Sequence, residues 1–279
     1  METLFTKGVS AFRHSFQPAM VLFVACSMKW LLILILSCLA VFGMVKVRDA
    51  ASQTQTTINR SYNSFALLEL FTSEGCSSCP PADRLLPQLA ATESNVITLA
   101  FHVDYWDRLG WKDPFSNAQF TNRQKVYGEH FKLESIYTPQ LVINGNFELV
   151  GSNKATAEAD IKKSLSGKPK VDLKISEVKR DHENLSVNCD LQGEWENTNL
   201  LAAVVQKHAE MNVKAGENRG AKLSHTNVVR TFLELPSKRD MNFEIEIPGD
   251  IASDNWQLIV YTQQRNDLTI TGAAVYTNP

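Results

Sequence analysis

The sequence predicts an α/β domain with the element order β-α-β-α-β-β-α, followed by an all-β, sandwich-like domain. Three observations support this fold class. Short apolar runs alternate with helical patterns as far as about residue 165. Two cysteines, Cys76 and Cys79, lie between the first apolar run and the first helical pattern. Beyond Gly167-Lys-Pro169, strand-like runs follow one another without a helical period, which is typical of a β-sandwich.

The size and charge of the chain agree with two globular domains. It has 279 residues and a formal net charge of -2. A chain of this length can bury two separate cores, and we expect them in residues 64–167 and 168–279. The balanced charge and the absence of a basic run argue against a nucleic-acid partner.

The N-terminal segment has a different composition. Residues 20–45 are almost wholly apolar and are interrupted by Lys29. This pattern fits a cleaved secretory signal, and it also fits a retained membrane anchor, because about twenty apolar residues span a bilayer. We expect residues 1–50 to be a signal peptide or anchor and residues 51–63 to be a polar linker. The remainder would then be periplasmic or secreted, either free or tethered to the inner membrane.

Local patterns define the elements of the first domain. The run Phe65-Ala-Leu-Leu-Glu-Leu-Phe71 is a short buried strand, and leucines at helical spacing follow the cysteines. The turn Asn144-Gly145 between two apolar runs predicts a hairpin. We therefore expect strands at 65–71, 96–103, 140–143 and 147–150, and helices after the cysteines, at 117–130 and from about residue 153.

The cysteine pair has the spacing of a thiol–disulfide site. Cys76 would lie at a helix N-terminus, where backbone N–H groups stabilise a thiolate, and Cys79 would lie one turn further on. Cys76 would then be the nucleophile and Cys79 the resolving cysteine. The same spacing also suits a static Cys76–Cys79 disulfide or half of a metal site, although zinc would need two further ligands. Because Pro80 and Pro81 follow directly, we expect the regular helix to begin near Pro80.

Two further features make this a thioredoxin-like site. Thr138-Pro139 precedes the predicted hairpin, and such a site needs a cis proline facing the cysteines. Thr138 would offer backbone hydrogen bonds to an extended substrate. The alternative is a plain trans proline at the start of a strand. Glu69 lies among apolar residues of the first strand and could accept the proton of Cys79, or it could have no role.

The loop after the second strand is rich in aromatic and acidic residues. Trp106 and Trp111 could line the active site and bind a substrate, or they could simply hold a long loop in place. We expect His102, at the end of the strand, to be a core residue with satisfied hydrogen bonds rather than a catalytic base.

The second domain contains two features of interest. A polar segment, residues 216–230, includes His225 and Arg230; it is either a loop with internal hydrogen bonds or a segment that docks on the redox face. Cys189 lies in a strand-like run, where a buried free thiol and an intermolecular disulfide are the two interpretations. We expect strands at about 170–177, 184–191, 199–206, 226–234, 242–247, 255–262 and 268–276.

These motifs resemble those of a bacterial family of unknown function, DUF1223. The resemblance rests on the long run from Leu68 to Asp83 and on several shorter motifs, and it spans roughly residues 64–276. The shorter motifs are His102-Val-Asp-Tyr-Trp-Asp107, Leu109-Gly-Trp-Lys-Asp-Pro-Phe115, Thr121 with Arg123-Gln124, Thr138-Pro139 and Asn227-Val-Val-Arg230. The resemblance implies a secreted or periplasmic protein of the thioredoxin-like superfamily, without a defined substrate.

We therefore expect a periplasmic or secreted thiol–disulfide oxidoreductase that acts through Cys76 and Cys79. Its partner would be a thiol or disulfide, in a protein or a small molecule, and no organic cofactor or metal is implied. The alternative is a non-catalytic envelope module for binding or assembly. In that case the two cysteines would form a structural disulfide or handle copper.

Overall fold

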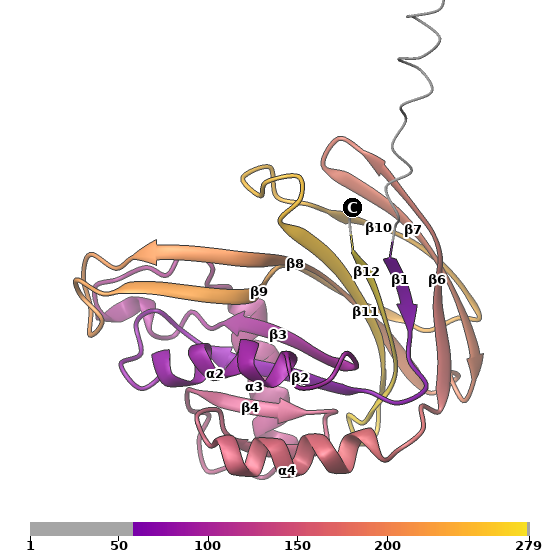
Figure 1. The fold of residues 1–279 in the computed structure, drawn as a ribbon, viewed down its shortest axis with the longest axis horizontal. Coiled ribbons are helices and arrows are strands. Elements are labelled where there is room, and N and C mark those ends of the chain that lie inside the picture. The colour runs from indigo at the N-terminus through magenta and orange to yellow at the C-terminus, as the bar shows by residue number, and fades with distance from the viewer. Residues whose placement is uncertain (1–57, 278–279) are drawn as a thin grey trace, which may run out of the picture. The chain divides into compact units, whose positions relative to one another are not determined.

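Two β-sheets dominate the structure, a computed structural model that describes residues 58–277. The larger sheet has nine strands in the order β1-β12-β11-β8-β9-β3-β2-β4-β5, and the smaller has the order β10-β7-β6 (Figure 1). The larger sheet comprises β1 (Ile58–Ser61), β2 (Ala66–Thr72), β3 (Val96–His102), β4 (Gln140–Ile143), β5 (Phe147–Val150), β8 (Thr198–Asn212), β9 (Lys222–Pro236), β11 (Trp256–Gln264) and β12 (Ile270–Thr277). The smaller comprises β6 (Val171–Asp181), β7 (Asn184–Gly193) and β10 (Asp240–Glu246).

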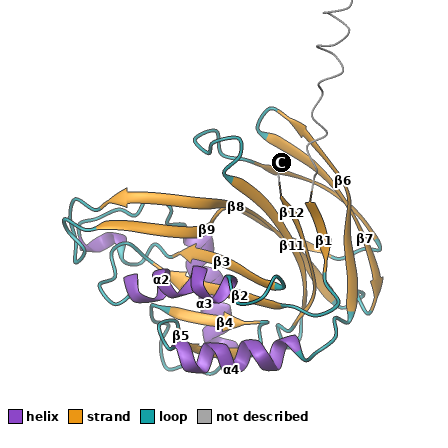
Figure 2. Ribbon diagram, in the orientation of Figure 1, coloured by secondary structure: helices purple, strands orange, loops and turns teal. Residues whose placement is uncertain are grey.

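The helices belong to the first half of the described chain (Figure 2). They are α2 (Pro80–Ala90), the short 3₁₀ helix η1 (Asp107–Leu109), α3 (Ala118–His130) and α4 (Lys154–Leu165). Between residues 66 and 165 the predicted element order is observed, with β2 and β3 parallel and β4 and β5 antiparallel. Asn144 and Gly145 form the predicted hairpin turn with positive φ angles of 50° and 70°.

The predicted fold class is nevertheless wrong, because the first half is not a separate α/β domain followed by a sandwich. β3 is buried along its whole length, so its outer edge needs a neighbouring strand. β9 from the second half lies parallel to it, with Ala100 paired to Val228. One sheet therefore runs through both halves. The sequence shows that β3 is buried on both faces, but it does not show which strand lies beside it.

Asn227 fixes the junction between β3 and β9. Its φ angle of 53° lies in the left-handed region, which asparagine tolerates better than branched residues. A few residues further along β9, the pairing of β8 with β9 shifts register, since Val204 pairs with Thr231 but Val205 pairs with Val229. The side-chain amide of Asn227 donates a hydrogen bond of 2.8 Å to the Thr98 hydroxyl on β3. Asn227 therefore connects the two strands where the halves of the sheet meet.

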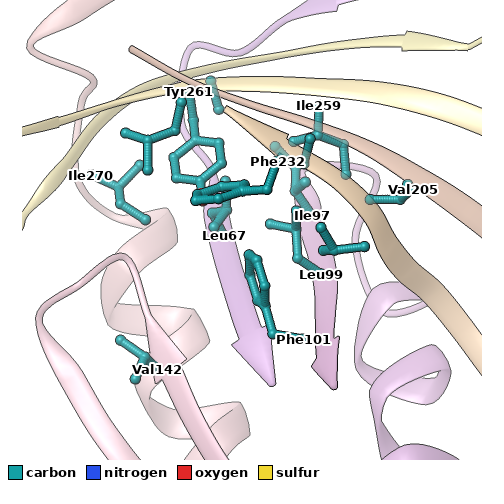
Figure 3. Close-up of a cluster of buried hydrophobic side chains, with 14 of the residues drawn as sticks. Leu67, Ile97, Leu99, Phe101, Val142, Val205, Phe232, Ile259, Tyr261 and Ile270 are labelled. Atoms are coloured by element: carbon teal, nitrogen blue, oxygen red, sulfur yellow. The ribbon is translucent and has the colours of Figure 1, made fainter. Parts of the chain in front are cut away.

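Each face of the β2–β3 region has its own core. On one face, Leu67 and Phe101 pack with Phe232, Tyr261 and Ile270 from β9, β11 and β12 (Figure 3). On the other face, α2 and α4 cover the alternate strand residues, since Leu68, Leu85 and Ile161 belong to one buried cluster. Burial of each such side chain contributes about 1.5–3 kcal/mol. The two faces of β2 therefore point into different layers.

The smaller sheet packs against the part of the larger sheet that contains β8 and β11. Alternate residues of β6 are buried against side chains of β8 and β11, including Val204, Trp256 and Leu258. Cys189 on β7 lies within this core as a buried free thiol, and burial raises its pKa to about 12. It is therefore a core residue, as the first of the two interpretations predicts.

No helix within residues 58–277 is both long enough and apolar enough to cross a membrane. The apolar segment 20–45, predicted to be a signal or anchor, lies outside the described residues, as do Cys26 and Cys38.

Candidate functional site

Cys76 and Cys79 lie in the tight turn that connects β2 to α2. The Cys76 N–H donates to the Ser73 carbonyl at 3.2 Å, and the Cys79 N–H donates to the Cys76 carbonyl at 3.2 Å. The regular helix begins at Pro80, as predicted, with Cys79 as its N-cap. Prolines fit these first positions because the N–H groups there have no helical partner. Both cysteines are free thiols, so the structure shows the reduced pair.

Thr138 lies next to the nucleophile candidate. The Thr138–Pro139 peptide bond is cis, as predicted. The Cys76 Sγ lies 3.7 Å from the Thr138 carbonyl oxygen and 3.2 Å from the Ser78 Oγ. The Trp106 indole N–H donates a 2.8 Å hydrogen bond to the Thr138 hydroxyl. The fold therefore brings four of the predicted site residues, Cys76, Thr138, Pro139 and Trp106, to one place.

The two thiols have opposite electrostatic environments. A hydrogen bond from Cys79 is the main reason why the pKa of Cys76 falls to about 6, against the opposing effect of burial. The hydroxyl of Ser78 lowers this pKa further. Burial raises the pKa of Cys79 far above its ordinary value, and the neighbouring Cys76 adds to the effect. Cys76 is therefore a thiolate near neutral pH, while Cys79 keeps its proton.

Neither cysteine has exposed surface, although Ser77 and Ser78 between them are exposed. A substrate disulfide must therefore displace a covering side chain to reach Cys76. Ser78 is the exposed neighbour whose hydroxyl contacts the Cys76 sulfur. Its side chain can rotate away without breaking a backbone hydrogen bond of the turn.

Five buried ionisable side chains lie beneath this turn. They are Glu74, Asp83, His102, Asp113 and His225. The sequence elements that supply them are far apart, since His225 belongs to β9 and Asp83 to α2. Buried charges need partners, and each of these groups has at least one polar partner in the cluster or at its edge.

His102 and Asp113 form the most closely bonded pair of the cluster. The His102 Nδ1 lies 2.6 Å from the Asp113 Oδ2, which also accepts the Glu74 backbone N–H at 2.8 Å. Burial alone would lower the pKa of His102, but Asp113 raises it. Conversely, His102 lowers the pKa of Asp113 against the effect of burial. His102 is therefore a buried, paired residue, although its Nε2 has no hydrogen-bond partner among the described residues.

Trp111 and Glu74 connect the cluster to the surface. The half-buried Trp111 donates from its indole N–H to the Glu74 Oε2 at 2.8 Å. The Glu74 Oε1 lies 3.1 Å from the His225 Nε2. The contact that the structure shows for Trp111 is therefore an orienting one, and its predicted contact with substrate stays a prediction.

The loop between β8 and β9 covers the cysteine turn. The Asn218 side-chain amide donates to the carbonyls of Glu74 and Cys76, at 2.8 and 2.9 Å. The Glu217 carboxylate accepts the Ser77 N–H at 3.1 Å. The first part of the polar segment 216–230 therefore docks on the cysteine turn. Its Arg230 points elsewhere, because it binds Asp250 at 2.7 Å.

Glu69 is not part of this site, which contradicts its predicted role as proton acceptor. It shares a face of β2 with Leu67 and Phe71, and that face points away from α2. Its carboxylate accepts hydrogen bonds from Arg123 at 2.7 and 3.0 Å and from the Tyr261 hydroxyl at 2.7 Å. Glu69 therefore joins β2 to α3 and β11 as half of a buried ion pair.

Asp83 is the carboxyl group that sequence reasoning missed. It lies one helical turn after Cys79, and its backbone N–H donates to the Cys79 carbonyl at 3.1 Å. Residues four apart share a helix face, so this spacing was a usable signal. Burial raises the pKa of Asp83, although His225 and His102 act in the opposite direction. The negative charge of Asp83 also contributes to the raised pKa of Cys79.

Within residues 58–277, no group of three or more His, Cys, Asp or Glu side chains is arranged to hold a metal ion.

Residues 67–263 match the family described as "Protein of unknown function (DUF1223)". A crystal structure of a protein from Agrobacterium tumefaciens resembles 78% of this chain and 96% of its own, with a TM-score of 0.61 and 23% identity. This similarity supports the fold alone. A domain of the outer membrane lipoprotein Omp28 from Porphyromonas gingivalis aligns with 39% of this chain and 88% of its own, at 6% identity and a TM-score of 0.26, and supports no conclusion. No curated protein gives a significant match.

Proposed function

We propose that this chain, which belongs to the DUF1223 family, is a thiol–disulfide oxidoreductase. The family description names no activity, so the proposal rests on the geometry of the cysteine pair. One observation supports this most strongly. The pKa of Cys76 is about 6, so this cysteine is ionised at neutral pH, while its neighbour Cys79 is held as a thiol. A static disulfide does not require a difference in pKa between its two cysteines, whereas thiol–disulfide exchange depends on such a difference.

The reaction follows from the two environments. The Cys76 thiolate attacks one sulfur of a substrate disulfide, forming a mixed disulfide and releasing the first substrate thiolate. Cys79 then gives up its proton and attacks the Cys76 sulfur. The Cys76–Cys79 disulfide forms, and the second substrate thiolate leaves and takes up a proton. The reverse sequence oxidises a substrate dithiol.

Asp83 is the proton acceptor that this step needs. The buried Cys79 has a strongly raised pKa, so it does not ionise without a base. Asp83 is on the same face of α2 one turn away, and its own pKa is raised, which makes its carboxylate a better base. Asp83 therefore takes the role that the sequence suggested for Glu69.

The substrate is a thiol or disulfide in an extended segment of a protein or in a small molecule. The Thr138 carbonyl next to Cys76 offers such a segment a backbone hydrogen bond. The half-buried Trp106, held by Thr138, and Trp111 flank the approach. We propose an extracytoplasmic location from the apolar segment 20–45, which acts as a signal or as a tether to the inner membrane.

Exchange with oxidised glutathione tests this proposal. The full-length chain is used, with Cys26 and Cys38 replaced by serine in every variant so that they do not react. Cys76→Ser should lower the exchange rate by about 100-fold or more. Cys189→Ser is the matched control, because Cys189 is also buried and free but lies in another core. Exchange by Cys76→Ser at the wild-type rate would refute the proposal.

A second candidate function follows from the burial of both cysteines. Two thiols without exposed surface also suit a structural disulfide in a non-catalytic envelope module. A disulfide of that kind has a reduction potential below about -300 mV and stays oxidised in glutathione buffers, whereas a catalytic pair is reduced more easily. Equilibration with glutathione buffers separates the two functions, and metal analysis of the purified protein tests the copper-handling form of this alternative.

A further inference from the structure

Two buried polar atoms face each other beneath the cysteine turn without a hydrogen bond. The His225 Nδ1 and the Asp83 Oδ2 are 3.9 Å apart, and their side chains are 1% and 6% exposed. Neither atom has another hydrogen-bond partner among the described residues. An unpaired buried polar atom costs about 1–3 kcal/mol, so these two atoms do not stabilise the fold through a hydrogen bond.

Both residues continue into longer paths. Asp83 lies one turn from Cys79, and its Oδ1 accepts a 2.9 Å hydrogen bond from the Thr72 hydroxyl. On the other side, the His225 Nε2 lies 3.1 Å from the Glu74 Oε1. The Glu74 Oε2 is bonded to the half-buried Trp111. Asp83, His225 and Glu74 therefore form a row of polar side chains that begins one helical turn from Cys79 and ends at the half-buried Trp111.

We propose that His225 is a positioning residue of the dithiol site, which relays a proton between Asp83 and Glu74 so that the Cys79 proton reaches solvent. The inference deepens the proposed oxidoreductase function and depends on it. It gives the β8–β9 hairpin, remote in sequence from the cysteines, a direct part in the reaction.

The proton balance of the relay is simple. Cys79 passes its proton to the Asp83 carboxylate as its sulfur attacks the mixed disulfide. Asp83 passes a proton to the His225 Nδ1, and His225 releases the proton on its Nε2 to Glu74, which exchanges it with water near Trp111. The Cys76–substrate S–S bond breaks and the Cys76–Cys79 bond forms. The leaving substrate thiolate is protonated from solvent.

The other groups that face His225 fit this path. Its ring lies 4.7 Å from the His102 ring, at 84°, and 5.9 Å from the ring of Phe115. His102 is bonded to Asp113 and so does not compete for Glu74 or Asp83. The ionisable groups around His225 are therefore Glu74, Asp83, His102, Asp113 and, through Asp83, the cysteine pair. Burial raises the pKa of the Asp83 carboxyl, whereas His102 lowers the pKa of Asp113.

The two attacks can be timed separately with equimolar dithiobis(nitrobenzoate), a symmetrical disulfide that releases a coloured thiolate at each step. The first release reports attack by Cys76, and the second reports attack by Cys79. The full-length chain with Cys26→Ser and Cys38→Ser is the parent protein. We expect His225→Gln to leave the first rate unchanged within about twofold and to slow the second by about tenfold or more near neutral pH. His208→Gln, on the exposed part of the same hairpin, is the matched control.

A double variant distinguishes a relay from a structural effect. If both residues act in one path, Asp83→Asn with His225→Gln should be no slower in the second step than Asp83→Asn alone. Rates that multiply instead would overturn the proposal. So would a second step of normal rate in His225→Gln. If the first release is missing in the parent protein, the proposed function itself fails, which is a different outcome.

NMR of the parent protein keeps the inference testable if His225→Gln does not fold. The nitrogen chemical shifts of the His225 imidazole, recorded at one pH, should differ between the reduced and oxidised forms, because oxidation removes the Cys79 proton from the path. Identical chemical shifts in both forms would overturn the proposal.

Discussion

Replacing Cys79 by alanine should raise the pKa of Cys76. The hydrogen bond from Cys79 is the largest of the effects that lower this pKa to about 6. Without it we expect a value near the ordinary cysteine pKa of about 8.5. At about pH 5.5, the thiolate fraction of Cys76 would then fall by about 200-fold. A thiolate of higher pKa is intrinsically more nucleophilic, which offsets this loss by a factor of about 10 to 20. The rate of attack by Cys76 should therefore fall by a remaining factor of about 10 to 20.

The assay is the ultraviolet absorbance of the thiolate as a function of pH, together with the rate of the first attack on dithiobis(nitrobenzoate). Ser78→Ala should produce a smaller shift in the same direction, because Ser78 is a lesser cause of the low pKa. Cys189→Ser should produce none. A Cys76 pKa that stays near 6 in Cys79→Ala would refute the reasoning, since the low pKa would then have a source other than the pair.

Three further predictions concern the framework of the site. Arg123→Met should destabilise the protein by about 3–5 kcal/mol in urea unfolding, because it leaves the Glu69 carboxylate buried and unpaired. Adding Glu69→Leu to this variant should recover part of the lost stability. No recovery in the double variant would contradict the pairing. The folded pKa of Asp83 is raised, so its contribution to stability is present at low pH and is lost as pH rises through that pKa. In thermal unfolding, Asp83→Asn should therefore become more stable relative to wild type as the pH rises above about 4. A stability difference that shrinks as the pH rises would contradict this prediction. Gly145→Ala should destabilise the turn strongly, because an added Cβ would lie 1.9 Å from the Leu268 carbonyl oxygen and φ is +70°; Gly110→Ala, also at positive φ but in open space, is the matched control.

The local structure of the site was predictable from the sequence. The cysteine spacing, the adjacent prolines and the Thr138-Pro139 motif each depend on backbone rules that act over a few residues. These rules placed the helix start at Pro80 and the cis bond at Pro139. Separately, the density of polar side chains in the segment 216–230 suggested that it could dock near the cysteines.

The long-range arrangement was not predictable in the same way. The run Val96–His102 shows that a strand is buried on both faces, but many strands could satisfy that requirement. In the structure the neighbouring strand is β9, and Asn227 connects it to β3. The left-handed backbone of Asn227 has no distinct signal in a single sequence. Once β9 lies beside β3, His225 comes to lie against Asp83, 142 positions away in the chain. The sequence allowed the segment that contains His225 to dock near the cysteines, but it did not identify Asp83 as the residue that His225 approaches.

Glu69 shows why apolar surroundings do not identify a base. The alternation of β2 correctly placed it with Leu67 and Phe71, but it did not show which face α2 covers. The face of Glu69 is covered by α3, which supplies Arg123. The carboxyl that lies one turn from Cys79, that of Asp83, comes instead from the helix of which Cys79 is the N-cap.

The most direct test of the central claim is the mixed disulfide that each cysteine variant forms. After reaction of the full-length chain with oxidised glutathione, intact mass and peptide mapping should find one glutathione on Cys76 in Cys79→Ser. They should find none on Cys79 in Cys76→Ser, because Cys79 remains protonated. Glutathione on Cys79, or no adduct in either variant, would contradict the assignment of Cys76 as the attacking thiolate.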